Sequence, residues 1–428
     1  MERASQRLSI LGGHINPLPD LQSELAAKAQ PIDDVWASLH FDQYLSEDKI
    51  ALRKKVRTFM ESIEKDVLPL PFHFNYQTLV NSIHKLNSVP KMAQLGINGL
   101  MIKDFGGPGF TNVESWAMIY EIAKVDMSVC TFLMVHNCIG MSVINYLGSE
   151  EQRARLLPEC IKLEKICSFG LTEPDYGSDA SSLRTSAKKV EGGYILNGQK
   201  RWIGNGTFAD YIIVWARNEA DGNRIQAFVV TKGSKGLTTK KIENKYALRI
   251  TQNADVYLDG VFVPDNMRLE KAKDFSSANQ ILEHSRIGVA WFGAALGAGA
   301  YEAALKYALS RKQFGKPIAQ FQATQLKLSK MLAQCEMMMS LCMRVSQLVD
   351  QGKTTIGQIG RAKAICSLTC REVISQAREI MGGNGILLEN RVIKHMLDAE
   401  VVHTYEGTYE VNMLVSGREI TGGLSAFK

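Results

Sequence analysis

A glutamate near the C-terminus has the surroundings that a general base needs. Glu406 lies in the tetrapeptide YEGT at 405–408, between aromatic residues and directly before Gly407. Apolar rings disfavour the charged form of a carboxylate, so its pKa rises toward the working pH, which suits a group that removes a proton. A glycine lets a ligand approach the backbone closely. The alternative is a surface glutamate in a turn, and the tetrapeptide alone does not decide between the two.

Other stretches upstream of Glu406 bear on this choice. They are LTEPDYGSD at 171–179, RWIGN at 201–205, RKQFGKP at 311–317 and MGGNG at 381–385. No Gly-x-Gly-x-x-Gly pattern follows a predicted strand, so a Rossmann nucleotide site is not expected.

The composition is typical of a globular protein with more than one domain. The 428 residues are 45% hydrophobic and 22% charged, and the net charge of +6 is spread along the chain. No basic run marks a nucleic-acid-binding surface. The eight cysteines lack zinc-site spacing, so we expect reduced core thiols and no metal. The longest uncharged apolar run, 287–301, is shorter than a membrane span, so no membrane-spanning helix is expected.

Helical periodicity dominates the first part of the chain after a lead-in. Residues 1–45 show no clear periodicity and form the lead-in, which is also a possible targeting segment. Residues 46–165 are predicted to form an N-terminal helical domain. It opens with a capped helix at Ser46, and its further helices are expected at 92–100, 112–123 and 128–147.

Short strands with turn signals follow at 166–276. Asn197-Gly198 predicts a type I′ hairpin turn between strands at 194–196 and 199–203. Further strands are expected at 211–215, 225–230, 256–258 and 261–263, with Asp259-Gly260 between the last two. Consecutive strands without intervening helices indicate an antiparallel barrel or sandwich.

Long helical periodicity returns at 277–428 and predicts a four-helix bundle. Its helices are expected at 278–311, 321–351 and 356–381, with a fourth running from about 391 through the 403–412 stretch. The predicted fold class is therefore α+β multidomain: an N-terminal helical domain, a central antiparallel β-domain and a C-terminal four-helix bundle.

The five stretches, in this order and on this plan, resemble the acyl-CoA dehydrogenase and acyl-CoA oxidase family over roughly residues 46–428. WIGNGTFAD at 202–210 and ITG at 420–422 are most similar to plant-type peroxisomal short-chain acyl-CoA oxidases. The resemblance implies an FAD enzyme of fatty acid β-oxidation that forms a trans-2 double bond in an acyl-CoA thioester. The Cα proton then needs an aligned base, and the Cβ hydrogen leaves as hydride to the flavin on the opposite face.

The resemblance assigns the base and the substrate contacts. Glu406 matches the base position, and Gly407 matches the place where the thioester passes the backbone. Some family members carry the base on an earlier helix, where this chain has Ser285, which cannot serve. The further substrate-binding matches are Ser178, Glu283, Arg286 and Arg418. For Glu283 and Arg286 the alternative is a surface ion pair, and for Arg418 a solvated helix face.

The resemblance also assigns FAD contacts in two groups. Those expected to meet the cofactor of the same subunit are Phe169, Thr172, Gly177, Ser178, Trp202, Gly204, Thr408 and Glu410. Those expected to reach the FAD of a neighbouring subunit are Arg311, Gln313, Phe314, Gln322, Glu379, Gly382 and Gly383. The cofactor site would then be complete only in a homodimer or homotetramer.

Two departures from the family pattern bear on the reaction. Dehydrogenases of the family commonly have Thr where this chain has Gly204, and the plant-type oxidase also has Gly. Glutaryl-CoA dehydrogenases hold the distal carboxylate with an Arg whose matching position here is Cys130, so a dicarboxylyl substrate is not expected.

The electron acceptor and the compartment are open between alternatives. Gly204 favours an oxidase that uses O2 and produces H2O2; the alternatives are a dehydrogenase that uses an electron-transfer flavoprotein and a non-catalytic acyl-CoA-binding relative. Arg7-Leu8, followed after five residues by His14-Ile15, resembles an N-terminal peroxisomal address. A mitochondrial presequence leading to the matrix is the alternative.

Overall fold

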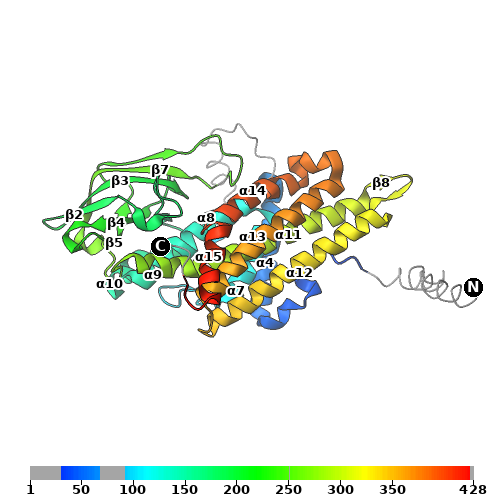
Figure 1. Cartoon of the computed structure of the whole chain (residues 1–428), viewed down its shortest axis with the longest axis horizontal. Helices are drawn as coiled ribbons and strands as arrows, with labels where there is room; N and C mark the ends of the chain where they lie inside the picture. Colours follow the sequence, from blue (N-terminus) through cyan, green and yellow to red (C-terminus); the bar gives the residue numbers. More distant parts are fainter. Residues whose placement is uncertain (1–29, 68–91, 250, 425–428) are drawn as a thin grey trace, which may run out of the picture.

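The β-sheet lies at one end of the molecule, and the long helices extend away from it toward the other end (Figure 1). The computed structural model describes residues 30–67, 92–249 and 251–424. Residues 7–15, which carry the predicted address, lie outside the described residues. The predicted helix at 92–100 is wrong, because only Met92 and Ala93 are helical and the following residues form turns. The N-terminal helices are α3 (Val35–Ser38), α4 (Glu47–Val67), α7 (Asn112–Val125), α8 (Met127–Met134), α9 (Ser142–Leu147) and α10 (Glu150–Ile161).

The predicted single helix at 128–147 is wrong, because a π-helical segment, Val135–Met141, separates α8 from α9. A Cβ on Gly140 would lie 2.4 Å from Cys167 Cβ, so the glycine allows the first strand to approach this segment. His136 ties the two together: its Nδ1 accepts from the Cys167 N–H at 3.0 Å, and Nε2 lies 2.9 Å from the Cys160 carbonyl. Burial lowers the pKa of His136 to about 4, so the ring is neutral.

The stretch that includes this π-helical segment is a longer apolar run than 287–301, the longest run expected from the sequence. Among the described residues, the stretch Met127–Leu147 is long and apolar enough to cross a membrane. In the structure 83% of its apolar window is buried inside the molecule, as in the core helix of a globular protein. Polar residues such as His136 and Asn137 interrupt the run 127–147, so its apolar character is less evident in the sequence than that of 287–301.

The β-domain contains one seven-stranded sheet in the order β1-β4-β2-β3-β7-β6, with β5 paired to β4. The strands are β1 (Cys167–Gly170), β2 (Ser186–Val190), β3 (Gly193–Ile203), β4 (Tyr211–Asn218), β5 (Arg224–Thr231), β6 (Leu237–Lys241) and β7 (Ala254–Pro264). Four pairings are antiparallel, but β1 and β2 both pair with β4 in parallel, which the sequence did not predict.

The predicted hairpin turns at Asn197-Gly198 and Asp259-Gly260 are wrong. β3 and β7 run straight through both dipeptides, which face each other where the register shifts from Leu196↔Val261 to Gly198↔Leu258. The Asn197 side chain accepts from the Gly260 N–H at 2.8 Å. Both turn signals therefore form one β-bulge, and the β2–β3 turn lies at residues 191–192 instead.

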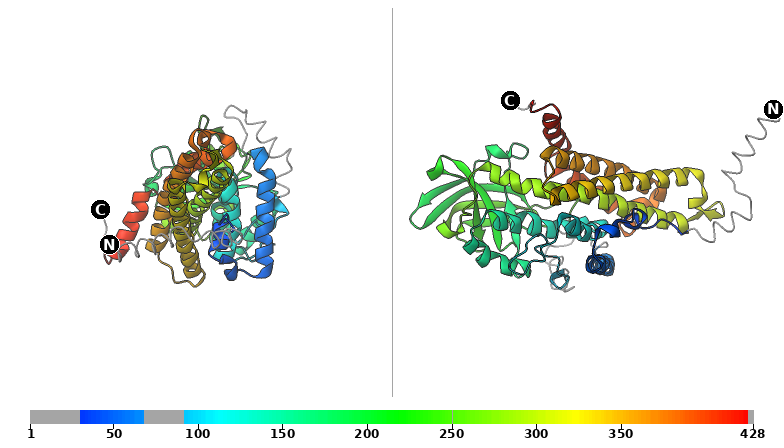
Figure 2. Two further views of the ribbon diagram at one scale, coloured as in Figure 1. Left: turned by 90° about the vertical axis from the view of Figure 1, so that its right-hand side faces the viewer. Right: turned by 90° about the horizontal axis from the view of Figure 1, so that it is seen from below.

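Long helices make up the C-terminal part. They are α11 (Phe275–Ser310), α12 (Gln322–Asp350), α13 (Ile356–Met381), α14 (Val392–Thr404) and α15 (Tyr409–Ile420). The short strands β8 (Lys312–Gln313) and β9 (Lys316–Pro317) form a hairpin at the end of the bundle that lies farthest from the sheet (Figure 1). Figure 2 shows α4 and α15 on opposite sides of the bundle.

The predicted fourth helix is broken in two, because Glu406 and Gly407 have left-handed backbone conformations with φ of 56° and 86°. α11 joins the two hydrophobic cores. Its residues Ala278 and Ile281 pack in the core around the sheet, and from Ile287 onward it packs in the core of the bundle. The residues between them, 282–286, therefore lie where the two parts meet.

Candidate active site

The break between α14 and α15 holds Glu406 at the junction of the domains. A non-glycine residue at positive φ is strained, so the surroundings must hold it in place. The Asn412 side chain donates to the carbonyls of Glu406, Gly407 and Thr408 at 3.3, 2.9 and 3.0 Å. Gly407 also has positive φ, and a Cβ there would lie 2.8 Å from Asn412 Nδ2, so only glycine suits this turn.

A buried lysine from the neighbouring helix completes the support of this turn. Lys363 on α13 is fully buried, and its Nζ donates to the carbonyls of His403 and Gly407 at 2.9 and 2.7 Å. Sequence reasoning missed Lys363, although a lysine on the apolar face of α13 could have marked it. The turn is therefore fixed from α13 and from the first turns of α15.

The carboxylate of Glu406 is in contact with α11. Its Oε2 accepts from Ser285 Oγ at 2.7 Å. Burial raises the pKa of Glu406, while the Ser285 hydrogen bond and the charges of Arg286 and Lys363 lower it in part. A carboxyl whose surroundings raise its pKa is a stronger base than a solvent-exposed one, which suits a group that takes up a proton.

Glu283 and Arg286 lie in the same turn of α11 as Ser285. Burial raises the pKa of Glu283, and the Arg286 charge lowers it. No ion pair joins the two within the described ranges, and the buried Nε of Arg286 has no hydrogen-bond partner there. The structure thus brings Glu283, Arg286, Glu406 and Gly407 together. Arg418 is exposed near the far end of α15, about 15 Å along the helix from Thr408.

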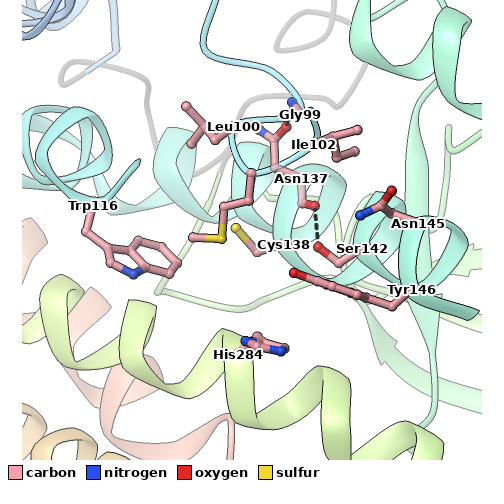
Figure 3. Close-up of a pocket in the computed structure, with 11 residues that line it drawn as sticks. Gly99, Leu100, Ile102, Trp116, Asn137, Cys138, Ser142, Asn145, Tyr146 and His284 are labelled. Carbon is pink, nitrogen blue, oxygen red and sulfur yellow. Dashed lines mark hydrogen bonds between the residues drawn. The ribbon is translucent and has the colours of Figure 1, made fainter. Parts of the chain in front are cut away.

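A cavity lies between α7, α9, α11 and the π-helical segment (Figure 3). Its wall includes His284 of α11, which stacks on Tyr146 of α9 with ring centroids 5.2 Å apart, and Cys138 of the π-helical segment. The Glu406 charge contributes to raising the pKa of Cys138, behind the larger effect of burial, so the two groups are close. Trp116 lies across the cavity from Tyr146 in Figure 3. It occupies space above Gly288, where a Cβ would lie 2.4 Å from the indole.

The predicted FAD loop at 172–178 is attached to β3. The Arg201 N–H donates to the Thr172 carbonyl at 2.9 Å, and the adjacent Trp202 is 52% exposed. Gly177 and Ser178 are exposed, and nothing lies within 4 Å of a Cβ built on Gly177. An open loop of small residues beside an exposed aromatic ring fits the pyrophosphate and the ring system of FAD. Phe169 differs from this pattern, because its side chain packs against Trp215 in the core.

A buried ion pair that the sequence did not reveal holds the base of this loop. Lys200 Nζ donates to Glu173 Oε1 at 2.8 Å and to the Leu171 carbonyl at 3.0 Å. Glu173 also accepts from the N–H groups of Arg184 and Thr185. Burial lowers the pKa of Lys200 to about 8, and the Glu173 charge raises it in part. The pair joins β3 to the start of the loop, and Glu173 connects that start to residues 184–185.

Gly204 lies in a buried position between β3 and the π-helical segment. Its carbonyl accepts from Ser168 Oγ at 2.6 Å, and a Cβ there would lie 2.9 Å from Val135 Cγ2. Thr408 caps the start of α15 by accepting from the Val411 N–H at 3.3 Å, and Glu410 is exposed in the first turn of that helix.

The second predicted FAD group is not brought to this site within one chain. Arg311, Gln313 and Phe314 lie at the β8–β9 hairpin, at the opposite end of the molecule from the sheet (Figure 1). Phe314 is 93% exposed. Gln322, Glu379, Gly382 and Gly383 are also exposed, and Glu379 pairs with Lys327 at 2.8 Å. In one chain these residues face outward.

Family models match nearly the whole described chain. Acyl-CoA dehydrogenase, N-terminal domain, matches residues 46–164; the middle domain matches 168–261; and the C-terminal domain matches 275–421. The order of a helical domain, a β-domain and a helical domain confirms the predicted fold class.

Curated relatives are similar over their full length. An acyl-CoA dehydrogenase of Bacillus subtilis (strain 168) is 32% identical over 389 residues, which are 89% of this chain and 100% of the relative. A short-chain specific acyl-CoA dehydrogenase of Megasphaera elsdenii is 33% identical over 84% of this chain and 98% of its own. The caffeyl-CoA reductase-Etf complex subunit CarC of Acetobacterium woodii is 32% identical over 87% of this chain and 98% of its own.

A solved structure shows the same fold with the cofactor bound. It is a glutaryl-CoA dehydrogenase from Mycobacterium smegmatis in complex with FADH2, with a TM-score of 0.83 and 28% identity. The match covers 92% of this chain and 99% of the solved one.

Proposed function

This chain belongs to the acyl-CoA dehydrogenase family, and from that premise we propose that it converts a short- or medium-chain acyl-CoA to the trans-2-enoyl-CoA with Glu406 as the base. The protein is an FAD-dependent acyl-CoA oxidoreductase. The observation that carries the proposal is the half-buried Glu406 carboxylate, held on a strained turn with a raised pKa, and with Ser285 Oγ as its one hydrogen-bond partner among the described residues.

The residues of the chain divide the work between holding the substrate and moving a proton. When bound, FAD supplies the acceptor for the hydride that leaves Cβ. Glu406 takes the Cα proton, so a C–H bond breaks, an O–H bond forms on the carboxyl, and the electron pair stays on the substrate. Gly407 leaves the backbone open to the thioester, and Arg286 offers to an anionic or carbonyl group a guanidinium N–H that has no hydrogen-bond partner among the described residues.

Trp116 supports the preference for shorter acyl chains. The indole packs over Gly288, which is one helical turn beyond Ser285 on the same face of α11. It also lines the same cavity as Cys138, whose pKa the Glu406 charge helps to raise. A large, fully buried ring in the wall of this cavity leaves little room for a long chain.

Two electron acceptors have support. Gly204 favours O2, with H2O2 as the product, because a hydroxyl of the type found in the dehydrogenases is missing from this position. The relative named as part of an Etf complex favours an electron-transfer flavoprotein. We propose O2 and retain the flavoprotein as the second candidate.

One experiment tests the reaction and separates the acceptors. Purified holoenzyme is mixed without oxygen with butyryl-CoA or octanoyl-CoA, the flavin absorbance is followed, and air is then admitted. We expect rapid bleaching, faster with butyryl-CoA, and rapid recovery with H2O2. Bleaching with slow recovery in air would instead identify the flavoprotein-dependent dehydrogenase.

The same experiment includes Glu406→Gln, with Glu400→Gln as its matched control. Glu400 lies on the exposed face of α14 and pairs only with Arg371 among the described residues, so its amide variant should bleach like the wild type. Glu406→Gln should retain FAD and bind acyl-CoA but lose bleaching by about 10³-fold or more, because an amide cannot accept the proton. Wild-type bleaching in this variant would refute the base assignment.

The assembly and compartment complete the proposal. We propose a homodimer or homotetramer in which the β8–β9 end of one chain meets the FAD of another, supported by the outward-facing Arg311, Gln313 and Phe314.

We also propose a peroxisomal location from Arg7-Leu8 and His14-Ile15, with the mitochondrial matrix as the alternative. Imaging a tagged full-length chain beside an Arg7→Ala/His14→Ala variant tests the location; unchanged import of the variant would refute it.

A further inference from the structure

The Ser285 hydroxyl has one proton and two acceptors within reach. Its Oγ lies 2.7 Å from Glu406 Oε2 and 3.1 Å from the Leu282 carbonyl of its own helix. Helical serines commonly donate to such a carbonyl one turn back, so that contact alone has no functional meaning. The shorter contact, to a half-buried carboxylate on a different segment, requires another explanation.

The protonation state of Glu406 decides between the two acceptors. A hydrogen bond to an ionised carboxylate is shorter and roughly twice as strong as one between neutral groups. While Glu406 is ionised, the hydroxyl therefore donates to Oε2. Once the carboxyl is protonated it becomes a weaker acceptor, and the Leu282 carbonyl competes on nearly equal terms.

We propose that Ser285 is a positioning residue that anchors Glu406 Oε2 and leaves Oε1 to receive the Cα proton. The inference rests on the proposed role of Glu406 as the base. Ser285 is the only hydrogen-bond partner of this carboxylate among the described residues, and Oε1 has none there. A carboxylate held at one oxygen presents the other in a fixed direction, which is what proton transfer from carbon requires.

The rigidity of both partners keeps this contact in place. Lys363 and Asn412 fix the backbone of Glu406, and Ser285 lies within the continuous helix α11, which packs on α13. The other ionisable groups near Glu406 are Arg286 on α11, Lys363 on α13, Tyr405 on the turn and Cys138 on the π-helical segment. Arg286 and Lys363 act on the carboxylate through charge, the Glu406 charge in turn raises the pKa of Tyr405 and of Cys138, and none of the four makes a hydrogen bond to the carboxylate among the described residues.

The anchor should favour the ionised form of the base, which makes it measurable. Removing a donor that prefers the ionised state raises the pKa of the carboxyl, by about one unit for the difference between a charge-assisted and a neutral hydrogen bond. On the acid side of the pH profile, kcat/KM should then fall about tenfold, and the deficit should shrink as the pH rises.

The test compares Ser285→Ala, which removes the hydroxyl, with Ser285→Thr, which keeps it. For each holoenzyme we would measure the pH profile of kcat/KM with butyryl-CoA, together with FAD content and melting temperature. Substrate-free infrared difference spectra, taken against the same protein carrying Glu406→Gln, would report the carboxyl titration directly. Ser285→Cys, with a weak donor of similar size, serves as a second variant and should shift in the same direction as Ser285→Ala.

The outcomes separate this inference from the proposed function. An acid limb and a carboxyl titration that move upward in Ser285→Ala and stay near the wild type in Ser285→Thr would support the anchor. No movement in Ser285→Ala and Ser285→Cys, or the same movement in Ser285→Thr, would show an ordinary helical serine and overturn it. Full activity in Glu406→Gln would instead refute the base assignment, whatever the serine variants do.

Discussion

At the scale of single residues, the lysine beneath the turn has an unusual position. Lys363 is fully buried on α13 and bonds two backbone carbonyls, those of His403 and Gly407, rather than a carboxylate. Burial lowers its pKa to about 8, and the Glu406 charge raises it in part. Burying an ammonium group without an ion pair is costly, so its benefit is the geometry of the turn that presents Glu406.

Replacing this lysine should affect catalysis more than stability. In Lys363→Met we expect kcat to fall about tenfold or more, because the turn loses its fixed support and a 1 Å displacement of a base is enough for that loss. Stability should change by only about 1 kcal/mol, because the relief of desolvation offsets the lost hydrogen bonds. Steady-state kinetics and denaturant unfolding measure the two effects.

The dependence of activity on pH gives a second, independent test of the role of Lys363. Above about pH 8 the wild-type Lys363 loses its proton, and its neutral amine is a weaker donor to the carbonyls of His403 and Gly407, so the turn loses support and activity should decline there. That alkaline decline should be absent from Lys363→Met. Lys330→Met, which removes an exposed lysine from α12, is the control. A variant that unfolds readily but keeps wild-type kcat in its folded fraction would limit Lys363 to a structural role.

At the scale of elements, periodicity predicted regular helices well and interruptions poorly. The bounds of α13 agree with the prediction of 356–381, because its apolar face is uninterrupted and Gly382 ends it. The break at Glu406 could not be predicted, because the positive φ of this glutamate depends on hydrogen bonds from Lys363 and Asn412. Lys363 is distant in the sequence, and the local pattern around Asn412 does not show that its side chain turns back to bond this turn. The helix propensities of neighbouring residues do not reveal such tertiary contacts.

The turn signals failed for a related reason. Asn197-Gly198 and Asp259-Gly260 each favour a turn locally, but in the sheet they face each other across one bulge. Two neighbouring strands that both tolerate the extra residue can form a bulge instead of turns. The candidate site shows the same limit: the resemblance named Glu406, Glu283 and Arg286, whereas the supporting Lys363 and the Lys200–Glu173 pair required coordinates.

The contact between β3 and the π-helical segment leads to a prediction at this scale. Gly204→Thr places a Cβ 2.9 Å from Val135 Cγ2 in a buried region, so it should lower stability by about 1–3 kcal/mol through overpacking. Adding Val135→Ala removes the methyl groups concerned. The double variant should therefore regain at least half of the loss in melting temperature, beyond what the separate effects predict.

The single variant Val135→Ala supplies the control for this cycle, because on its own it only opens a small cavity. Melting temperature and bound FAD would be measured for all four proteins. A strictly additive result would mean that the backbone at Gly204, and not the contact with Val135, excludes a side chain there.

At the scale of the whole molecule, the two predicted groups of FAD contacts lie at opposite ends of the chain. The loop at 172–178 and Trp202 lie at the sheet, while Arg311, Gln313 and Phe314 lie at the β8–β9 hairpin beyond the long helices (Figure 1). An aromatic side chain that is 93% exposed, as Phe314 is, is uncommon on a surface that meets only solvent. The long helices of the bundle set the separation between the two groups.

If the hairpin of one chain completes the FAD site of another, cofactor retention must depend on assembly. We expect Arg311→Ala to lose FAD faster than the wild type, with the apparent FAD dissociation constant rising about tenfold, as for one lost charge-assisted hydrogen bond. Lys312→Ala removes an equal charge from the same hairpin and should retain FAD normally. FAD fluorescence and light scattering would be followed together on dilution, because binding to an assembled state is linked to protein concentration. In the wild type, flavin release should then coincide with dissociation into single chains. Release that is independent of concentration, with Arg311→Ala equal to Lys312→Ala, would mean that each chain holds its cofactor alone.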